Sequence, residues 1–142
     1  MIYLLDTNVI SEISVRPKPS PDVVAWAKSL PASNMCISVI TIAEIEAGVA
    51  AAQVPSRRAH YAQALEEMRR EYQDRIAVID EPAAIAYVKL HRQLKAAGTN
   101  IDPADALIAA TALANDWTVA TRNAKHFERT GASVVNPWDH AA

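Results

Sequence analysis

Five short apolar segments constrain the fold of this chain more than any other feature of its sequence. They contain no charged residue and lie at residues 2–5, 35–38, 76–79, 118–121 and 132–135. Short apolar runs of this kind are typical of strands that are buried on both faces of a parallel sheet. Helical patterns or short connections separate the runs, so we expect an α/β fold with a mainly parallel sheet of about five strands.

The segments between these strands contain signals for helix starts and distinct patterns of charge. Ser20-Pro21, Asp80 and Asp102-Pro103 each combine a capping residue with a helix-compatible start. Residues 40–53 are nearly all apolar, which predicts a helix buried on most sides, whereas the charge-rich residues 56–75 predict a solvated helix or helical hairpin.

Composition limits the class of protein. The 142 residues are 51% hydrophobic and contain no Gly-, Ser- or Pro-rich linker in mid-chain and no internal repeat, which predicts one domain over residues 1–142. A formal charge of −2 does not favour a general nucleic-acid coat protein, so any RNA contact must be local. A lone cysteine, Cys36, which we expect in the core, indicates a reducing compartment, and neither a signal peptide nor a membrane span of ~20 apolar residues is readable. We therefore expect a cytoplasmic protein that does not contact membranes.

Acidic residues directly after an apolar segment or within apolar helical stretches are the unusual feature of this sequence. An unpaired carboxylate in such surroundings costs several kcal/mol or takes up a proton, so these acids need compensation. Asp6 follows the first strand, and ligands of open α/β sheets bind at the carboxyl ends of strands. Asp6 is equally well explained as a helix cap.

Two further segments carry candidate acids. Glu44 and Glu46 point roughly 200 degrees apart around their helix, and spacing alone does not choose between them. Asp105 is the third residue of a helix capped by Asp102. This position suits a metal ligand, but it also suits the acidic partner of a capping box.

Taken together, these acids predict a site for a hard cation. Mg²⁺ prefers oxygen ligands and is typically held by one or two carboxylates, water and substrate phosphates. Such a site polarises a phosphate and makes water a better nucleophile, so hydrolysis of a phosphodiester fits it. Other chemistries lack support, because the sequence offers no phosphate-binding Gly-rich loop, no Gly-x-Ser-x-Gly motif and no paired histidines with zinc spacing.

Five motifs stand out along the sequence: LLDTNVISE (4–12), ITIAE (40–44), DALIAATA (105–112), TVATRN (118–123) and NPW (136–138). They resemble the motifs of one known family, the PIN-domain nucleases, and within it the VapC toxins of toxin–antitoxin pairs, particularly the FitB-like branch. They occur in family order over nearly the whole chain. The resemblance implies a PIN-like three-layer fold and a Mg²⁺- or Mn²⁺-dependent endoribonuclease.

The resemblance also assigns the site residues. It implies that Asp6 and Asp105 are the principal metal ligands and that Glu44, rather than Glu46, is the third acid. The fourth acidic position of the family falls on Asn123, which cannot supply the same charge, so we expect one well-held ion and a weaker or absent second. Asn123 can still orient water or phosphate, and it is equally well explained as a helix cap.

The partners that the resemblance implies are RNA, often tRNA or ribosomal RNA, and a cognate antitoxin of the VapB or FitA type. Homodimers and toxin–antitoxin hetero-oligomers are usual in the family, and DNA is bound only through the antitoxin. Arg122 and Lys125 are candidate phosphate contacts, although surface charge alone also explains them.

The sequence leaves two alternative functions open. An aspartate-dependent phosphatase also places an acid after its first strand, but its Asp-x-Asp pattern would need an acid where Asn8 stands. A non-catalytic module that binds RNA or a partner protein is the other alternative, with Asn123 as a sign of a decayed site.

Overall fold

Five parallel strands form the centre of the computed structural model, which describes residues 1–141. They are β1 (Tyr3–Leu5), β2 (Met35–Ser38), β3 (Ile76–Ala77), β4 (Thr118–Ala120) and β5 (Ser133–Val135). The sheet order is β3-β2-β1-β4-β5, and every neighbouring pair is parallel. The parallel five-stranded sheet expected from the apolar segments is therefore confirmed, with each strand inside its predicted segment.

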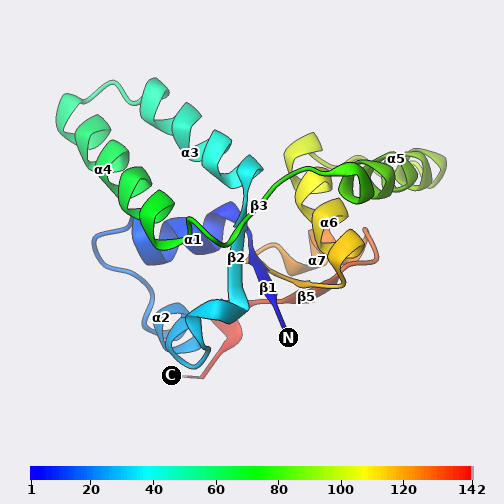
Figure 1. The fold of residues 1–142 in the computed structure, drawn as a ribbon, viewed down its shortest axis with the longest axis horizontal. Helices are drawn as coiled ribbons and strands as arrows, with labels where there is room; N and C mark the ends of the chain where they lie inside the picture. Colours follow the sequence, from blue (N-terminus) through cyan, green and yellow to red (C-terminus); the bar gives the residue numbers. More distant parts are fainter. Residues whose placement is uncertain (142) are drawn as a thin grey trace.

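Seven helices connect and cover these strands (Figure 1). They are α1 (Thr7–Ser14), α2 (Pro21–Lys28), α3 (Val39–Ala51), α4 (Pro55–Glu71), α5 (Glu81–Ala96), α6 (Pro103–Asn115) and α7 (Ala124–Glu128), with 3-10 turns η1 (Ala32–Asn34) and η2 (Pro137–Asp139). The side chains of Asp80 and Asp102 cap α5 and α6 as the sequence predicts. Ser20 precedes α2, but its side chain makes no capping hydrogen bond.

Alternating strand residues give the sheet an apolar layer on each face. Leu5 belongs to a core shared with α1, α2, α3 and α4, whereas its neighbour Leu4 belongs to a second core shared with α5, α6 and α7. Both leucines are fully buried. Strands buried on both faces explain why the strand segments are apolar without alternation.

The chain order creates one topological switch point in the sheet. From β1 the chain adds β2 and β3 on one side, and it then returns to add β4 and β5 on the other side. Ligands of such sheets bind at the carboxyl ends of the strands where the order reverses. Here these ends point between the α3–α4 pair and the α5–α6 pair (Figure 1).

The expectation that the helix in residues 40–53 is buried on most sides is wrong. The α3–α4 pair extends away from the sheet (Figure 1), and the buried residues of α3 are only Thr41, Ile42 and Ile45. The exposed apolar residues of α3 are all alanine or glycine, which offer little apolar area to bury, so α4 and the sheet need to cover only one side. No helix in the described part of the chain is long and apolar enough to cross a membrane.

Phe127 anchors α7 in the second core and is the largest fully buried side chain. We expect Phe127→Ala to lower the free energy of unfolding by about 3–5 kcal/mol, because it removes buried apolar area and leaves a cavity. Urea unfolding measures this change. Val88→Ala is the control, since Val88 is 52% exposed; equal losses for both variants would contradict the described core.

Candidate functional site

Asp6 lies at the switch point, directly after the central strand β1. Its side chain is almost fully buried, and Oδ1 accepts a hydrogen bond from the Thr7 amide at 2.8 Å. The cap expected as one explanation is therefore present. Oδ2 accepts bonds from Thr121 Oγ1 at 2.8 Å and from Asn8 Nδ2 at 3.2 Å. Burial raises the pKa of Asp6, although the bonds from Thr121 and Thr7 oppose this.

Glu44 reaches the start of α1 from the first turns of α3. Its Oε1 accepts a bond from Thr7 Oγ1 at 2.6 Å, and that hydroxyl lies 3.1 Å from Thr41 Oγ1. Glu46 instead pairs with Arg69 at 3.2 Å, and its side chain is 62% exposed. The geometry thus connects Glu44, and not Glu46, to the residue that follows Asp6.

Asp105 occupies the first turn of α6, as predicted. Its Oδ2 lies 3.4 Å from Nε2 of His126, and its side chain is 24% exposed. Within residues 1–141, Asp105 makes no capping-box bond to the Asp102 amide. Burial, followed by the charge of Asp6, raises the pKa of Asp105 to about 6, while His126 opposes the shift and Asp102 and Glu44 add to it.

Asn123 lies just after the carboxyl end of β4, at the N-terminus of α7. Its backbone amide donates to Thr121 Oγ1 at 3.0 Å, the hydroxyl that also bonds to Asp6. The side chain is exposed and makes no capping hydrogen bond. The helix-cap explanation for Asn123 therefore lacks a capping bond, and its amide group remains accessible from solvent.

The acids form an open cluster in which carboxylates repel one another. The charges of Asp6 and Glu44 both raise the pKa of Asp105, and the charge of Glu44 also raises the pKa of Asp6. No three His, Cys, Asp or Glu side chains among residues 1–141 approach closely enough to enclose a metal on their own. An all-oxygen set of this kind suits Mg²⁺, which keeps several waters and needs only one or two carboxylates.

The residues that orient the acids were not identified from the sequence. Asn8 bonds to Asp6 and also accepts a bond from the Arg122 amide at 3.2 Å. Thr121 becomes a partner of Asp6 only because β4 lies beside β1, with Leu5 paired to Ala120. Thr7 and Asn8 directly follow Asp6, and this proximity in sequence is a signal that could have identified them. No local pattern indicates the contacts of Thr121 or His126.

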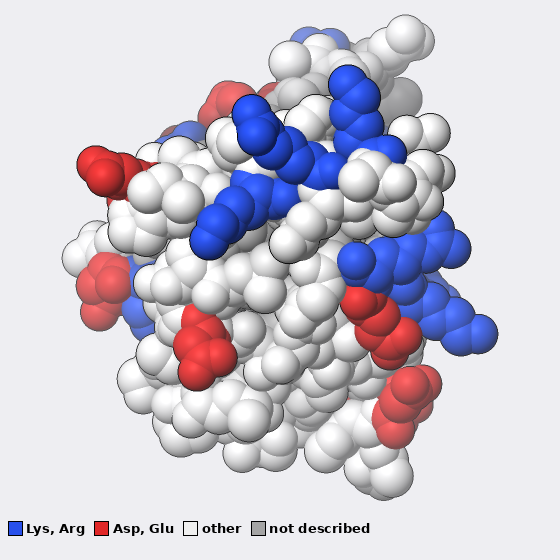
Figure 2. All heavy atoms as spheres, turned by 90° about the vertical axis from the view of Figure 1, so that its right-hand side faces the viewer, with Lys and Arg blue, Asp and Glu red and all other residues white. Residues whose placement is uncertain are grey.

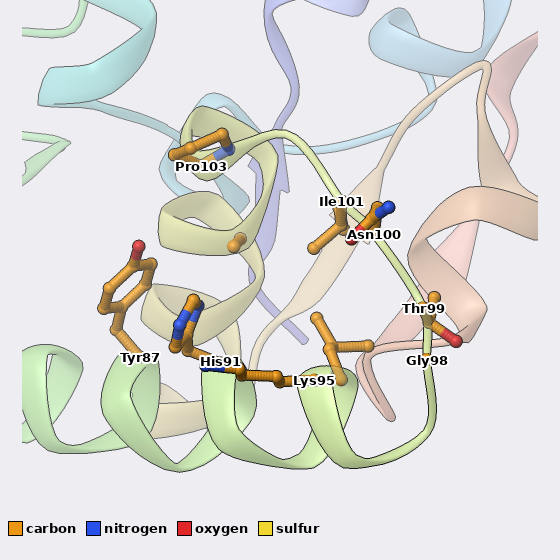
Figure 3. A pocket seen from close by; sticks show the side chains of 10 residues that line it. Tyr87, His91, Lys95, Gly98, Thr99, Asn100, Ile101 and Pro103 are labelled. Atoms are coloured by element: carbon orange, nitrogen blue, oxygen red, sulfur yellow. The ribbon is translucent and has the colours of Figure 1, made fainter.

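A hollow whose lining does not include the candidate acids lies between α5 and α6. It has a volume of about 380 Å³, and Figure 3 shows Tyr87, His91 and Lys95 on one side and Pro103 on the other. Its lining contains no carboxylate. This cavity therefore does not offer a second site for a hard cation.

The raised pKa of Asp105 predicts a pH-dependent effect on stability. In the unfolded chain this group titrates near 4, so between about pH 4 and 6 the folded state binds the extra proton, and stability falls as pH rises. We expect Asp105→Asn to stabilise the metal-free protein by about 1–3 kcal/mol at pH 7 and by little at pH 4.

Urea unfolding in EDTA at both pH values measures this gain. Asp74→Asn is the matched control, because its side chain is 80% exposed and its removal should matter little. A gain from Asp105→Asn that is the same at both pH values would contradict the raised pKa.

Comparison with known proteins identifies the family of this chain. The PIN domain family matches residues 3–132. The chain is 38% identical over 141 residues to a VapC ribonuclease of Sinorhizobium fredii, covering 99% of this chain and 100% of the relative. It is 40% identical over 138 residues to the toxin FitB of Neisseria gonorrhoeae, covering 96% and 99% of the two chains.

Solved structures give the same result for the fold. The crystal structure of FitAcB from Neisseria gonorrhoeae matches with a TM-score of 0.88 and 40% identity, covering 97% of this chain and 99% of that chain. Other similar structures come from toxin–antitoxin complexes, including one of the VapBC family. The three-layer PIN-like fold is therefore confirmed, and the chain belongs to the PIN domain family, in the group that contains the VapC and FitB toxins.

Proposed function

We propose that this protein is the endoribonuclease toxin of a toxin–antitoxin pair and that Asp6, Glu44 and Asp105 hold, directly or through bound water, the metal ion with which it hydrolyses RNA. The observation that carries the proposal is the clustering of these acids at the switch point, where their mutual repulsion favours a cation. PIN-domain ribonucleases generally use a divalent metal. We propose Mg²⁺ here, with Mn²⁺ as a substitute.

Each residue has a defined task in this proposal. Asp6 and Asp105 are the principal ligands, and Glu44 is the third acid. Thr7 holds Glu44 through its hydroxyl, while Thr121 and Asn8 fix one oxygen of Asp6 and leave little freedom to its side chain. Bound Mg²⁺ supplies polarisation of the phosphodiester and activation of water.

Asn123 completes the site as a neutral group. Its exposed amide can donate to a phosphate oxygen or orient water, but it adds no negative charge. We therefore propose one tightly held ion, with a weak second ion or none.

The partners follow from the relatives. We propose that an antitoxin of the VapB or FitA type covers the acidic site and that DNA is bound only through this antitoxin, because similar structures are toxin–antitoxin complexes. The substrate is RNA, since similar proteins are ribonucleases. We further propose that the whole chain acts as one domain, forms homodimers and works in the cytoplasm.

An aspartate-dependent phosphatase is not supported. Asn8 occupies the position where the second acid would stand, and its side chain bonds to Asp6 and to the Arg122 amide. The non-catalytic module remains the alternative that the cleavage experiment decides.

The direct test is cleavage of total cellular RNA by purified protein freed of antitoxin. With Mg²⁺ or Mn²⁺ we expect discrete fragments, which disappear in EDTA and with Asp105→Asn. Intact RNA from folded protein under all conditions would favour a binding module.

The two glutamates of α3 provide a matched pair of variants. We expect Glu44→Gln to lower the cleavage rate about 100-fold or more, because a metal-site carboxylate is lost. Glu46→Gln should leave the rate unchanged, since Glu46 only pairs with Arg69 at the surface. Equal effects of the two substitutions on the rate at saturating RNA would contradict the assignment of Glu44.

A further inference from the structure

We propose that the cleft formed by α7, the loop before it and the turn around η2 binds the phosphate backbone of the RNA beside the scissile bond, with Arg122 and Lys125 as its main contacts. This inference rests on the proposed ribonuclease function. It adds a substrate subsite to the metal site.

The cleft adjoins the acids directly. Its volume is about 560 Å³, and its lining includes Arg122, Asn123, Lys125, His126 and Asn136. His126 connects it to the acidic cluster, because Nε2 lies 3.4 Å from Asp105 Oδ2. An RNA strand whose scissile phosphate lies at the acids therefore has this cleft as a neighbouring space.

Arg122 is held in place for a contact to phosphate. Its guanidinium carbon lies 4.9 Å from the centre of the Trp138 ring, and its backbone amide donates to Asn8. Trp138 is itself held, because its amide donates to Asn136 Oδ1 at 2.9 Å. A guanidinium that is already oriented loses less conformational entropy on binding, and its fork of donors suits phosphate.

The basic side chains of this cleft differ from several other arginines of the protein, which are paired with carboxylates. Arg16, Arg69 and Arg75 each lie within ion-pair distance of a carboxylate. Among residues 1–141, no carboxylate lies within ion-pair distance of Arg122 or Lys125, and both side chains are exposed. They remain available to an external anion.

Basic and acidic side chains lie at different ends of the cleft. The lining carboxylates Glu128 and Asp139 are shared with the next hollow, towards Trp26, whereas Arg122, Lys125 and His126 line only this cleft. The cationic end is thus the one that adjoins Asp105. Asn123 lies at this end, and because it is neutral it does not repel a phosphate.

The overall charge of −2 does not oppose such local binding. A negative net charge does not prevent Lys and Arg side chains from gathering locally, as they do over the upper part of the face drawn in Figure 2. Phosphate contacts of this kind position the backbone without reading sequence. We therefore expect this cleft to contribute affinity and register rather than base specificity.

The test measures binding of a short fluorescein-labelled oligouridylate by anisotropy, in Mg²⁺ and in an Asp105→Asn background that prevents cleavage. Arg122→Met and Lys125→Met should each weaken binding about tenfold and flatten the slope of log K against log salt by about 0.7, as loss of one phosphate contact requires. Arg129→Met is the control, because Arg129 is exposed at the end of α7 but does not line the cleft.

The same substitutions in the active protein give a second readout. Arg122→Met should raise KM for RNA with little change in kcat, and Arg122→Lys should restore part of the affinity, because the charge returns without the planar contact to Trp138. The inference would be overturned if the affinity, salt slope and KM of the Arg122→Met and Lys125→Met variants matched those of Arg129→Met in protein that still cleaves RNA. The proposed function would then remain intact. If the unsubstituted protein neither cleaves nor binds RNA, both the inference and the proposed function are overturned.

Discussion

The central constraint on this molecule is the concentration of negative charge at the carboxyl end of β1. Asp6 is nearly buried, and its position is fixed by bonds from Thr121 and Asn8. Burial and neighbouring carboxylates raise the pKa of Asp6 and Asp105, so their ionised forms are destabilised in the free protein. In the proposed function a divalent cation removes this penalty, so the same feature that costs stability serves metal binding.

The scaffold brings the acids together from distant parts of the sequence. Asp6 follows the central strand, Glu44 comes from α3 and Asp105 from α6, and these helices lie in the two layers that cover opposite faces of the sheet. The parallel sheet defines where they meet, because its strand order reverses between β1 and β4. Thr121, at the end of β4, then links the acidic cluster to the loop that carries Arg122 and Asn123.

The sequence predicted the elements well, because strands buried on both faces and capped helices leave strong local signals. The five strands and the caps of α5 and α6 were found in this way. The exposure of α3 was not predicted, because an apolar run rich in small residues does not show how much of the helix surface another helix covers. Asp6 and Asp105 were anomalous enough to be noticed, but spacing did not separate Glu44 from Glu46. The roles of Thr121 and His126 depend on which elements are neighbours in space, which no local pattern encodes.

Direct measurement of metal binding tests the central claim most closely. Titration of the antitoxin-free protein with Mn²⁺, followed by electron paramagnetic resonance, counts bound ions without relying on cleavage, and competition with Mg²⁺ shows whether both use one site. Asp6→Asn tests the ligand, with its unfolding transition as the check on folding. We expect one tightly bound Mn²⁺ ion that Mg²⁺ displaces and that Asp6→Asn releases. Folded protein that binds no divalent ion, or that binds it equally well after Asp6→Asn, would contradict a metal site at Asp6.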